Sequence, residues 1–354
     1  HVISGNPPRV RLNGDTYAVK YRELSPDEAH DMLYEIMSKE HQAAFEKNKG
    51  VDFAYQTPEL GRFRVNVFEH MRGIGAVFRV IPTEILTLAD LRLPPVIKNL
   101  CRQRKGLILV TGPTGSGKST TLAAMVDFIN SERKGHILTI EDPVEFLHQN
   151  KGCLISQREV GSNTMSFADA LHSSLREDPD VILVGEMRDL ETVHLALTAA
   201  EMGSLVMGTL HTSGAAASVD RMINVFPAAE EAFIRTMIST SLVGVISQQL
   251  LRTADRKGRV AALEIMINNP AIANLIREGK TEQIESVIQG STMQGMQRMD
   301  TALRRLLDAK IISGDDAYLK ARNKADFERF REGYEEDLTN EDSDTTAGET
   351  KSLL

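Results

Sequence analysis

The stretch "LILVTGPTGSGKSTTLAAMV" contains the pattern G-x-x-x-x-G-K-[ST] between an apolar run and a segment with helical spacing. Glycines in such a loop let successive backbone N–H groups curve around a phosphate, and the amino end of the following helix adds a partial positive charge. Lys118 is expected to reach the β- and γ-phosphates of a nucleotide, and Ser119 to ligate Mg²⁺. A merely structural turn would leave a lysine where a helix disfavours cations. The predicted phosphate-binding residues are Gly112, Pro113, Thr114, Gly115, Ser116, Gly117, Lys118, Ser119 and Thr120.

Acidic residues end two other apolar runs. In "PDVILVGEMRD", Glu186 follows the run directly, and nucleotide hydrolysis needs an acid that orients water or metal. We therefore predict Glu186 to be the general base or water-orienting residue, against the alternative of an ordinary surface glutamate. In "HILTIEDPVEF", Glu141 and Asp142 end the run. Taken alone, a turn-capping aspartate before Pro143 explains this second pair as well as a catalytic role does.

A histidine follows a third apolar run, in "LVMGTLHTSGAAAS". Alone, His211 is best interpreted as a core residue at a strand end. If the three strands belong to one parallel sheet, however, Gly112, Glu186 and His211 all lie at the same edge. This placement favours a role for His211 in contacting the γ-phosphate and responding to its loss. A metal-binding role is disfavoured, because no second His or Cys sits nearby at ligand spacing.

The elements that position these residues alternate between strand and helix from Val96 onward, which predicts an α/β domain with a parallel sheet and helices on both faces. The predicted strands are the apolar runs 107–110, 137–140, 181–184, 205–210 and 262–267, and a helical segment follows to Arg331.

The pattern of residues 1–82 predicts a separate α+β unit. It has a hairpin signal at Asn13-Gly14, a capping box from Ser25 to Glu28 and two alternating strands in "GRFRVNVFEHMRGIGAVFRVI". Residues 83–95 follow Pro82 and end in Pro94-Pro95, a pattern that predicts a linker.

Composition narrows the function classes. The chain has 354 residues, 42% hydrophobic and 25% charged, which is typical of a globular protein of about two domains. Of the net charge of −8, the segment from Glu332 to Leu354 contributes −7, from eight acids and one lysine. The body is thus close to neutral, so nucleic acid is not the expected partner. We expect the tail to be disordered because it has little apolar surface to bury.

Three further features bear on location and completeness. No run approaches the roughly 18 apolar residues of a membrane span. The two cysteines, Cys101 and Cys153, are too few for a disulfide framework and fit a reducing cytoplasm. The sequence lacks an initiator Met and a secretory signal, which predicts that it starts inside a longer gene product.

The order of motifs "GPTGSGKS", "TIEDPVEF", "VILVGEMRD" and "GTLHTSGA" resembles the secretion-ATPase superfamily, the hexameric motors of type IV pili and type II secretion. The runs "ISQREVG" and "AIANLIREGK" are similar to those of the pilus retraction motors of the PilT/PilU type. The resemblance covers nearly the whole chain.

The resemblance implies a PAS-like N-terminal domain, truncated at its start, at 1–82, and a RecA-like P-loop ATPase domain with C-terminal helices at 96–331. It also implies a cytoplasmic homohexamer at the inner-membrane base of the pilus, with ATP and Mg²⁺ between the two domains. A membrane platform protein is the implied partner, with a paralogous retraction ATPase as a further one. The motif at Glu141 becomes the family's acidic box, and Arg64, Arg72 and Arg79 become candidates for an arginine finger, among which the sequence does not choose.

The chain departs from the family pattern at two places. Ser204 stands where retraction motors commonly carry a second histidine, and Ala273 stands where they usually have arginine. The acidic tail resembles the accessory retraction paralogue. The alternatives are a pilus-assembly or type II secretion ATPase, whose usual four-cysteine zinc module two cysteines exclude, a RecA-like nucleic-acid translocase, and a non-hydrolysing nucleotide-dependent scaffold. The pairing of Lys118 with Glu186 argues against the scaffold.

Overall fold

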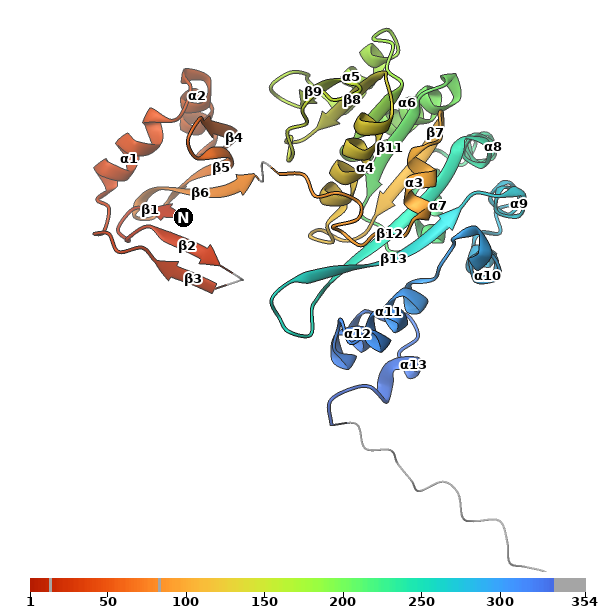
Figure 1. Cartoon of the computed structure of the whole chain (residues 1–354). Coiled ribbons are helices and arrows are strands. Elements are labelled where there is room, and N and C mark those ends of the chain that lie inside the picture. Colours follow the sequence, from red (N-terminus) through yellow and green to blue (C-terminus); the bar gives the residue numbers. More distant parts are fainter. Residues whose placement is uncertain (13–14, 82–83, 334–354) are drawn as a thin grey trace, which may run out of the picture. The chain divides into compact units, whose positions relative to one another are not determined.

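The computed structural model describes residues 1–12, 15–81 and 84–333. The chain separates into two compact units: one joins His1–Gly106 to Ser119–Gly208, and the other joins Leu107–Lys118 to the chain from Thr209 onward. Figure 1 gives the elements in chain order. The predicted tail lies largely outside the described residues, and the predicted domain boundaries remain predictions.

The N-terminal part of the first unit is an antiparallel sheet with two helices. The sheet order is β1-β6-β5-β4, and β2 and β3 form a separate hairpin. The predicted turn of that hairpin, Asn13-Gly14, lies outside the described residues, but the strands on both sides of it pair as predicted. The elements are β1 (Val2–Ile3), β2 (Arg9–Leu12), β3 (Asp15–Ala18), α1 (Pro26–Glu35), α2 (Lys39–Asn48), β4 (Gly50–Thr57), β5 (Gly61–His70) and β6 (Gly73–Ile81).

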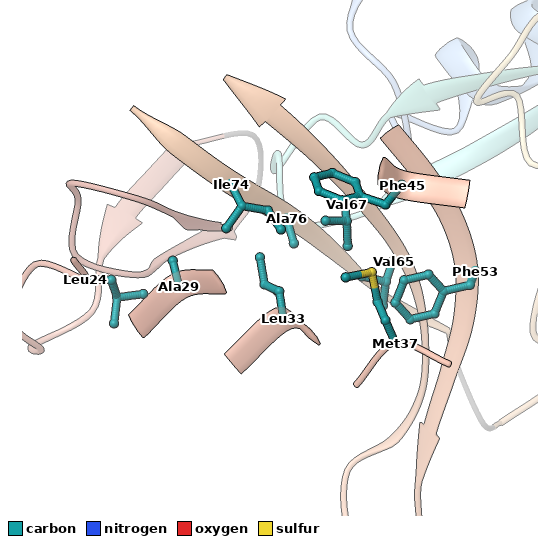
Figure 2. Close-up of a cluster of buried hydrophobic side chains, with 10 residues drawn as sticks. All are labelled: Leu24, Ala29, Leu33, Met37, Phe45, Phe53, Val65, Val67, Ile74 and Ala76. Atoms are coloured by element: carbon teal, nitrogen blue, oxygen red, sulfur yellow. The ribbon is translucent and has the colours of Figure 1, made fainter. Parts of the chain in front are cut away.

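Helix α1 begins at the predicted capping box. Ser25 Oγ accepts a hydrogen bond from Glu28 N (3.2 Å), and Glu28 Oε2 accepts one from Ser25 N (3.0 Å). The helix places Ala29 and Leu33 against the sheet, and Figure 2 shows these side chains pointing toward Ile74 and Ala76 of β6. The N-terminal sheet therefore has its own buried apolar core beneath α1 and α2.

The larger sheet has seven strands in the order β13-β12-β7-β11-β10-β8-β9. Strands β8, β9, β10 and β11 pair in parallel, and β12 pairs in parallel with β7. The prediction of an all-parallel sheet is wrong at β13, which pairs antiparallel with β12. An antiparallel edge strand on a largely parallel sheet is common, and an apolar run does not reveal its direction. The strands are β7 (Gly106–Thr111), β8 (His136–Glu141), β9 (Leu154–Glu159), β10 (Val181–Val184), β11 (Leu205–Leu210), β12 (Leu242–Arg252) and β13 (Arg259–Ile267).

The helices of this part of the chain match the predicted alternation, and the segment after Pro270 is helical as expected. They are α3 (Val96–Cys101), α4 (Lys118–Glu132), α5 (Phe167–Ser174), α6 (Leu190–Met202), α7 (Ala215–Ile223), α8 (Glu231–Ser241), α9 (Pro270–Glu278), α10 (Ile284–Gly290), α11 (Met299–Asp308), α12 (Gly314–Lys320) and α13 (Ala325–Glu328), with 3₁₀ turns η1 (Thr281–Gln283) and η2 (Thr292–Gln294).

Both cysteines are buried and free. Burial raises the pKa of the Cys101 thiol to about 12 and also raises the pKa of Cys153. Among the described residues, no helix combines the length and apolarity needed to cross a bilayer.

Candidate active site

The glycine-rich loop lies between β7 and α4, as predicted. Gly112, Gly115 and Gly117 have positive φ angles of 143°, 79° and 88°. A Cβ on Gly112 would lie 2.3 Å from the carbonyl oxygen of Gln248, and one on Gly117 would lie 2.8 Å from Gln248 Nε2. Glycine is therefore required at both places by backbone conformation and by the neighbouring strand β12.

Gln248 on β12 stabilises this loop by a hydrogen bond. Its side chain is buried, and its Nε2 donates a hydrogen bond of 2.6 Å to the carbonyl oxygen of Ser116. The interaction joins residues 132 positions apart, so no local sequence pattern pointed to Gln248. Sequence reasoning missed this residue, and only the pairing of β12 with β7 reveals it.

Lys118 is the first residue of α4 and folds back over the loop. Its Nζ donates to the carbonyl oxygens of Gly112 (2.9 Å) and Pro113 (3.3 Å). The ammonium group is thus held at the concave side of a loop whose glycines allow close backbone approach. The half-buried hydroxyl side chains of Ser119 and Thr120 follow at the helix start. These residues fit a nucleotide's phosphates and an accompanying Mg²⁺.

His211 is exposed at the end of β11, so it is not a core residue. Its Nδ1 lies 3.5 Å from Oγ1 of Thr114 in the glycine-rich loop. The backbone N–H of Gly112 also donates to the carbonyl oxygen of Leu210, the residue before the histidine (3.2 Å). The structure therefore brings His211 and the glycine-rich loop together. The role of His211 in sensing the γ-phosphate remains a prediction.

Glu186 and Glu141 form a second group, in the first unit. Gly185 N donates to the carbonyl oxygen of Ile140 (2.7 Å), which joins the ends of β10 and β8. Glu186 Oε1 is 2.5 Å from Arg188 Nε, and Glu186 Oε2 accepts a hydrogen bond of 2.6 Å from Arg188 Nη2. Sequence reasoning did not single out this arginine, whose pKa the carboxylate raises.

Burial raises the pKa of the Glu141 carboxyl, although hydrogen bonds from Thr139 and Gln157 partly offset the effect. Thr139 Oγ1 donates to Glu141 Oε1 at 2.7 Å, and Gln157 Nε2 does so at 3.4 Å. A carboxyl group that is partly shielded from water and held by two donors is suited to positioning rather than to ion pairing.

The three candidate arginines fall into two groups. Arg64 on β5 lies directly opposite Arg79 on β6, and such antiparallel partners point to the same face of the sheet. Arg72 lies in the turn between the strands, seven residues from Arg79 and hence roughly 20 Å away along an extended strand. One phosphate group therefore cannot contact all three. Two like charges that face each other are unfavourable, and a bound anion would relieve their repulsion. This argument favours Arg64 and Arg79 as the pair that contacts an anion.

A fourth arginine, Arg62, was missed. Its Nη2 donates to Glu159 Oε2 at 2.9 Å, and both side chains are largely buried. Glu159 Oε2 also accepts a hydrogen bond of 3.0 Å from the backbone N–H of Val144, which lies within the acidic-box motif. A cavity of about 590 Å³ adjoins this contact and is lined by Arg62, Arg64 and Glu159 among others. Glu159 thus connects strand β5 to the acidic-box loop.

His148, at the end of the acidic-box segment, leads to a prediction about pH. Burial lowers its pKa to about 4, while the unfolded chain takes up the proton near pH 6.5. The unfolded state therefore binds more protons between these values, and the free energy of unfolding should fall as pH falls through this window. From pH 7 to 5, the histidine should contribute a loss on the order of 1–2 kcal/mol. Urea unfolding of His148→Gln should show a correspondingly smaller decline than the unaltered chain, and an equal decline would exclude this origin.

Comparison with known proteins agrees with the geometry. Residues 51–311 match the family model described as type II/IV secretion system protein. The chain therefore belongs to this family, and the expected superfamily is confirmed.

Particular relatives narrow the class. The chain is 52% identical to the "Twitching motility protein" of Neisseria gonorrhoeae, covering 89% of this chain and 84% of the relative. It is 51% identical to the "Type IV pilus retractation ATPase PilT" of Pseudomonas aeruginosa, covering 92% and 95%. It is also similar to the crystal structure of the pilus retraction motor PilT with bound ADP, at TM-score 0.86 and 45% identity over 92% of this chain and 94% of that one. The prediction of a retraction-motor ATPase is confirmed by these relatives.

Proposed function

We propose that this chain hydrolyses ATP and uses the energy to drive the retraction of a type IV pilus. The supporting observation is the phosphate loop between β7 and α4, with Lys118 folded over it and His211 beside it. We infer a RecA-like ATPase domain preceded by a PAS-like domain, since the order of elements agrees with the resemblance.

The residues have separate roles in this proposal. The loop N–H groups and Lys118 bind the β- and γ-phosphates, while Ser119 supplies an oxygen ligand for Mg²⁺, which shields phosphate charge when bound. Glu186 orients the attacking water and accepts its proton. Because the Glu186 carboxylate is held by Arg188, this guanidinium must release it before the water is activated. Glu141 positions groups around that water, and His211 responds to loss of the γ-phosphate.

We further propose that six copies form a ring and that Arg64 or Arg79 acts as an arginine finger. Phosphoryl transfer spreads negative charge over the phosphate oxygens, and a mobile cation stabilises that charge in the transition state. A change in the angle between the N-terminal and ATPase domains then moves a platform protein at the cytoplasmic face of the inner membrane. A paralogous retraction ATPase is a further proposed partner.

Helix α9 offers a test of coupling to the pilus. Asn269 caps it, Pro270 is its first residue, and Ile272 and Ile276 are buried. Arg277 and Glu278 are exposed on its other side. Reversing both charges (Arg277→Glu with Glu278→Arg) should leave ATPase activity within about twofold, because exposed ion pairs contribute little stability.

Pilus retraction should nevertheless fail in cells that carry this double variant in place of a deleted chromosomal copy. The readout is twitching motility together with surface pili counted by microscopy. Cells without the protein should keep pili that do not retract, and loss of pili would instead indicate assembly. Parallel loss of ATPase activity and retraction in the double variant would assign α9 a structural role.

A further inference from the structure

The turn at residues 211–214, which carries His211 and is called the histidine turn below, is held by a row of buried polar groups. Thr111, Ser247 and Glu264 lie opposite one another on β7, β12 and β13. The backbone N–H of Gly214 donates to Ser247 Oγ at 2.8 Å, and the N–H of Ala215 donates to Glu264 Oε1 at 2.8 Å. The end of the histidine turn is therefore fixed to the sheet by side chains rather than by strand pairing.

Glu264 is unusual within this row because it can carry a full charge while only 2% exposed. A buried carboxylate is destabilising unless it is paired and hydrogen-bonded. The amino end of α7 supplies one donor, and Gly214 has no side chain that could cap that helix. Two further donors are Arg322, whose Nη2 donates to Glu264 Oε1 at 3.1 Å, and the backbone N–H of Met299, which donates to Oε2 at 3.4 Å.

Arg322 belongs to the C-terminal helical segment, just after α12. Its backbone N–H and that of Asn323 donate to the two carboxylate oxygens of Asp300 on α11, at 2.8 and 3.0 Å. The guanidinium passes so close to the histidine turn that a Cβ on Gly214 would lie 2.0 Å from Arg322 Nη2. The φ of 105° favours glycine at position 214, and a side chain there would displace the Arg322 guanidinium.

We propose that Glu264 and Arg322 are positioning residues for ATP hydrolysis. The pair holds the histidine turn against the phosphate loop and connects that turn to the C-terminal helices. This inference rests on the proposed ATPase function. Through this pair, a displacement of α11 and α12 moves Gly214 and, three residues earlier, His211. The C-terminal helices are thereby coupled to the step at which the γ-phosphate is lost.

The test is Arg322→Gln in the full-length assembled protein, with kcat and KM for ATP measured separately. We expect kcat to fall by about tenfold or more while KM stays within about twofold, because the loop that binds the phosphates is unchanged. Arg322→Lys keeps the charge and should recover a large part of kcat. Arg304→Gln removes a comparable arginine, paired with exposed Asp308 on α11, and should behave like the unaltered protein.

A double-mutant cycle with His211→Ala separates positioning from general stability. Once His211 is removed, Arg322→Gln should cause little additional loss of kcat, because the group that it positions is absent. An equal loss with and without His211 would overturn the proposal, as would unchanged kcat in Arg322→Gln. If thermal unfolding shows that Arg322→Gln does not fold, Arg322→Lys gives the same cycle with a smaller effect. Failure of the ATPase proposal looks different, since the unaltered chain would then hydrolyse no more ATP than Glu186→Gln.

Discussion

Glu186→Gln should bind ATP as tightly as the unaltered chain and lose turnover by about 10²–10⁴-fold, the usual contribution of a positioned general base. Glutamine keeps the size of the side chain but cannot accept the proton of the attacking water. Because Glu186 follows β10 and is not part of the phosphate loop, its replacement leaves the loop glycines and Lys118 in place. The measurements are affinity for a fluorescent ATP analogue and release of phosphate.

Lys118→Ala should give the opposite pattern, with nucleotide affinity itself lost. In the proposed function the lysine supplies the cation that contacts the phosphates, and its Nζ also donates to the loop carbonyls of Gly112 and Pro113. Glu191→Gln, an exposed change in the first turn of α6, is the control and should affect neither quantity. An equal loss of ATP affinity in Glu186→Gln and Lys118→Ala would contradict the separate roles.

Replacing the proposed arginine finger should lower kcat by about 10³–10⁵-fold. We expect this loss from Arg64→Gln or Arg79→Gln, because these residues face each other across β5 and β6 and form a concentrated positive charge. Only Asp52, 3.8 Å from Arg64 and half exposed, offsets that charge among the ion pairs of the described residues. The large loss should appear in kcat with the affinity for ATP nearly kept.

Arg72→Gln is the matched comparison, because it removes the same charge from the far end of the same hairpin. It should leave kcat within about twofold of the unaltered chain. The assignment fails if Arg72→Gln causes the largest loss, or if all three variants hydrolyse ATP normally. Steady-state ATPase assays on the assembled protein distinguish these outcomes.

The sequence predicted best those features that depend on neighbouring residues. The capping box at Ser25 and the strand–loop–helix around Lys118 each need only a few adjacent side chains. Strand β12 was missed because Gln248 and Gln249 interrupt its apolar run, although both continue the ladder with β13. Strand β9 was missed for a similar reason, since an edge strand needs little apolar character.

In the candidate site, too, features that depend on neighbouring residues were predicted and long-range contacts were not. The glycine-rich loop, Glu186 and His211 were predicted from strand ends, whereas several contacts around these residues join distant parts of the chain. Gln248, the Arg62–Glu159 pair and the Glu264–Arg322 pair join residues 132, 97 and 58 positions apart. Charge and residue type alone do not show such pairings, because many arginines and glutamates could satisfy them equally well.

The burial and protonation of the two native cysteines make it possible to follow helix movement with a dye attached to a new cysteine. Only a thiolate reacts rapidly with maleimide dyes, and the buried Cys101, with its pKa raised to about 12, is almost entirely protonated at neutral pH. Cys153 is also buried, with a raised pKa. A single cysteine introduced at an exposed position such as Glu278 on α9 should therefore take up dye selectively. Fluorescence can then report the movement of that helix during turnover without removing either native thiol.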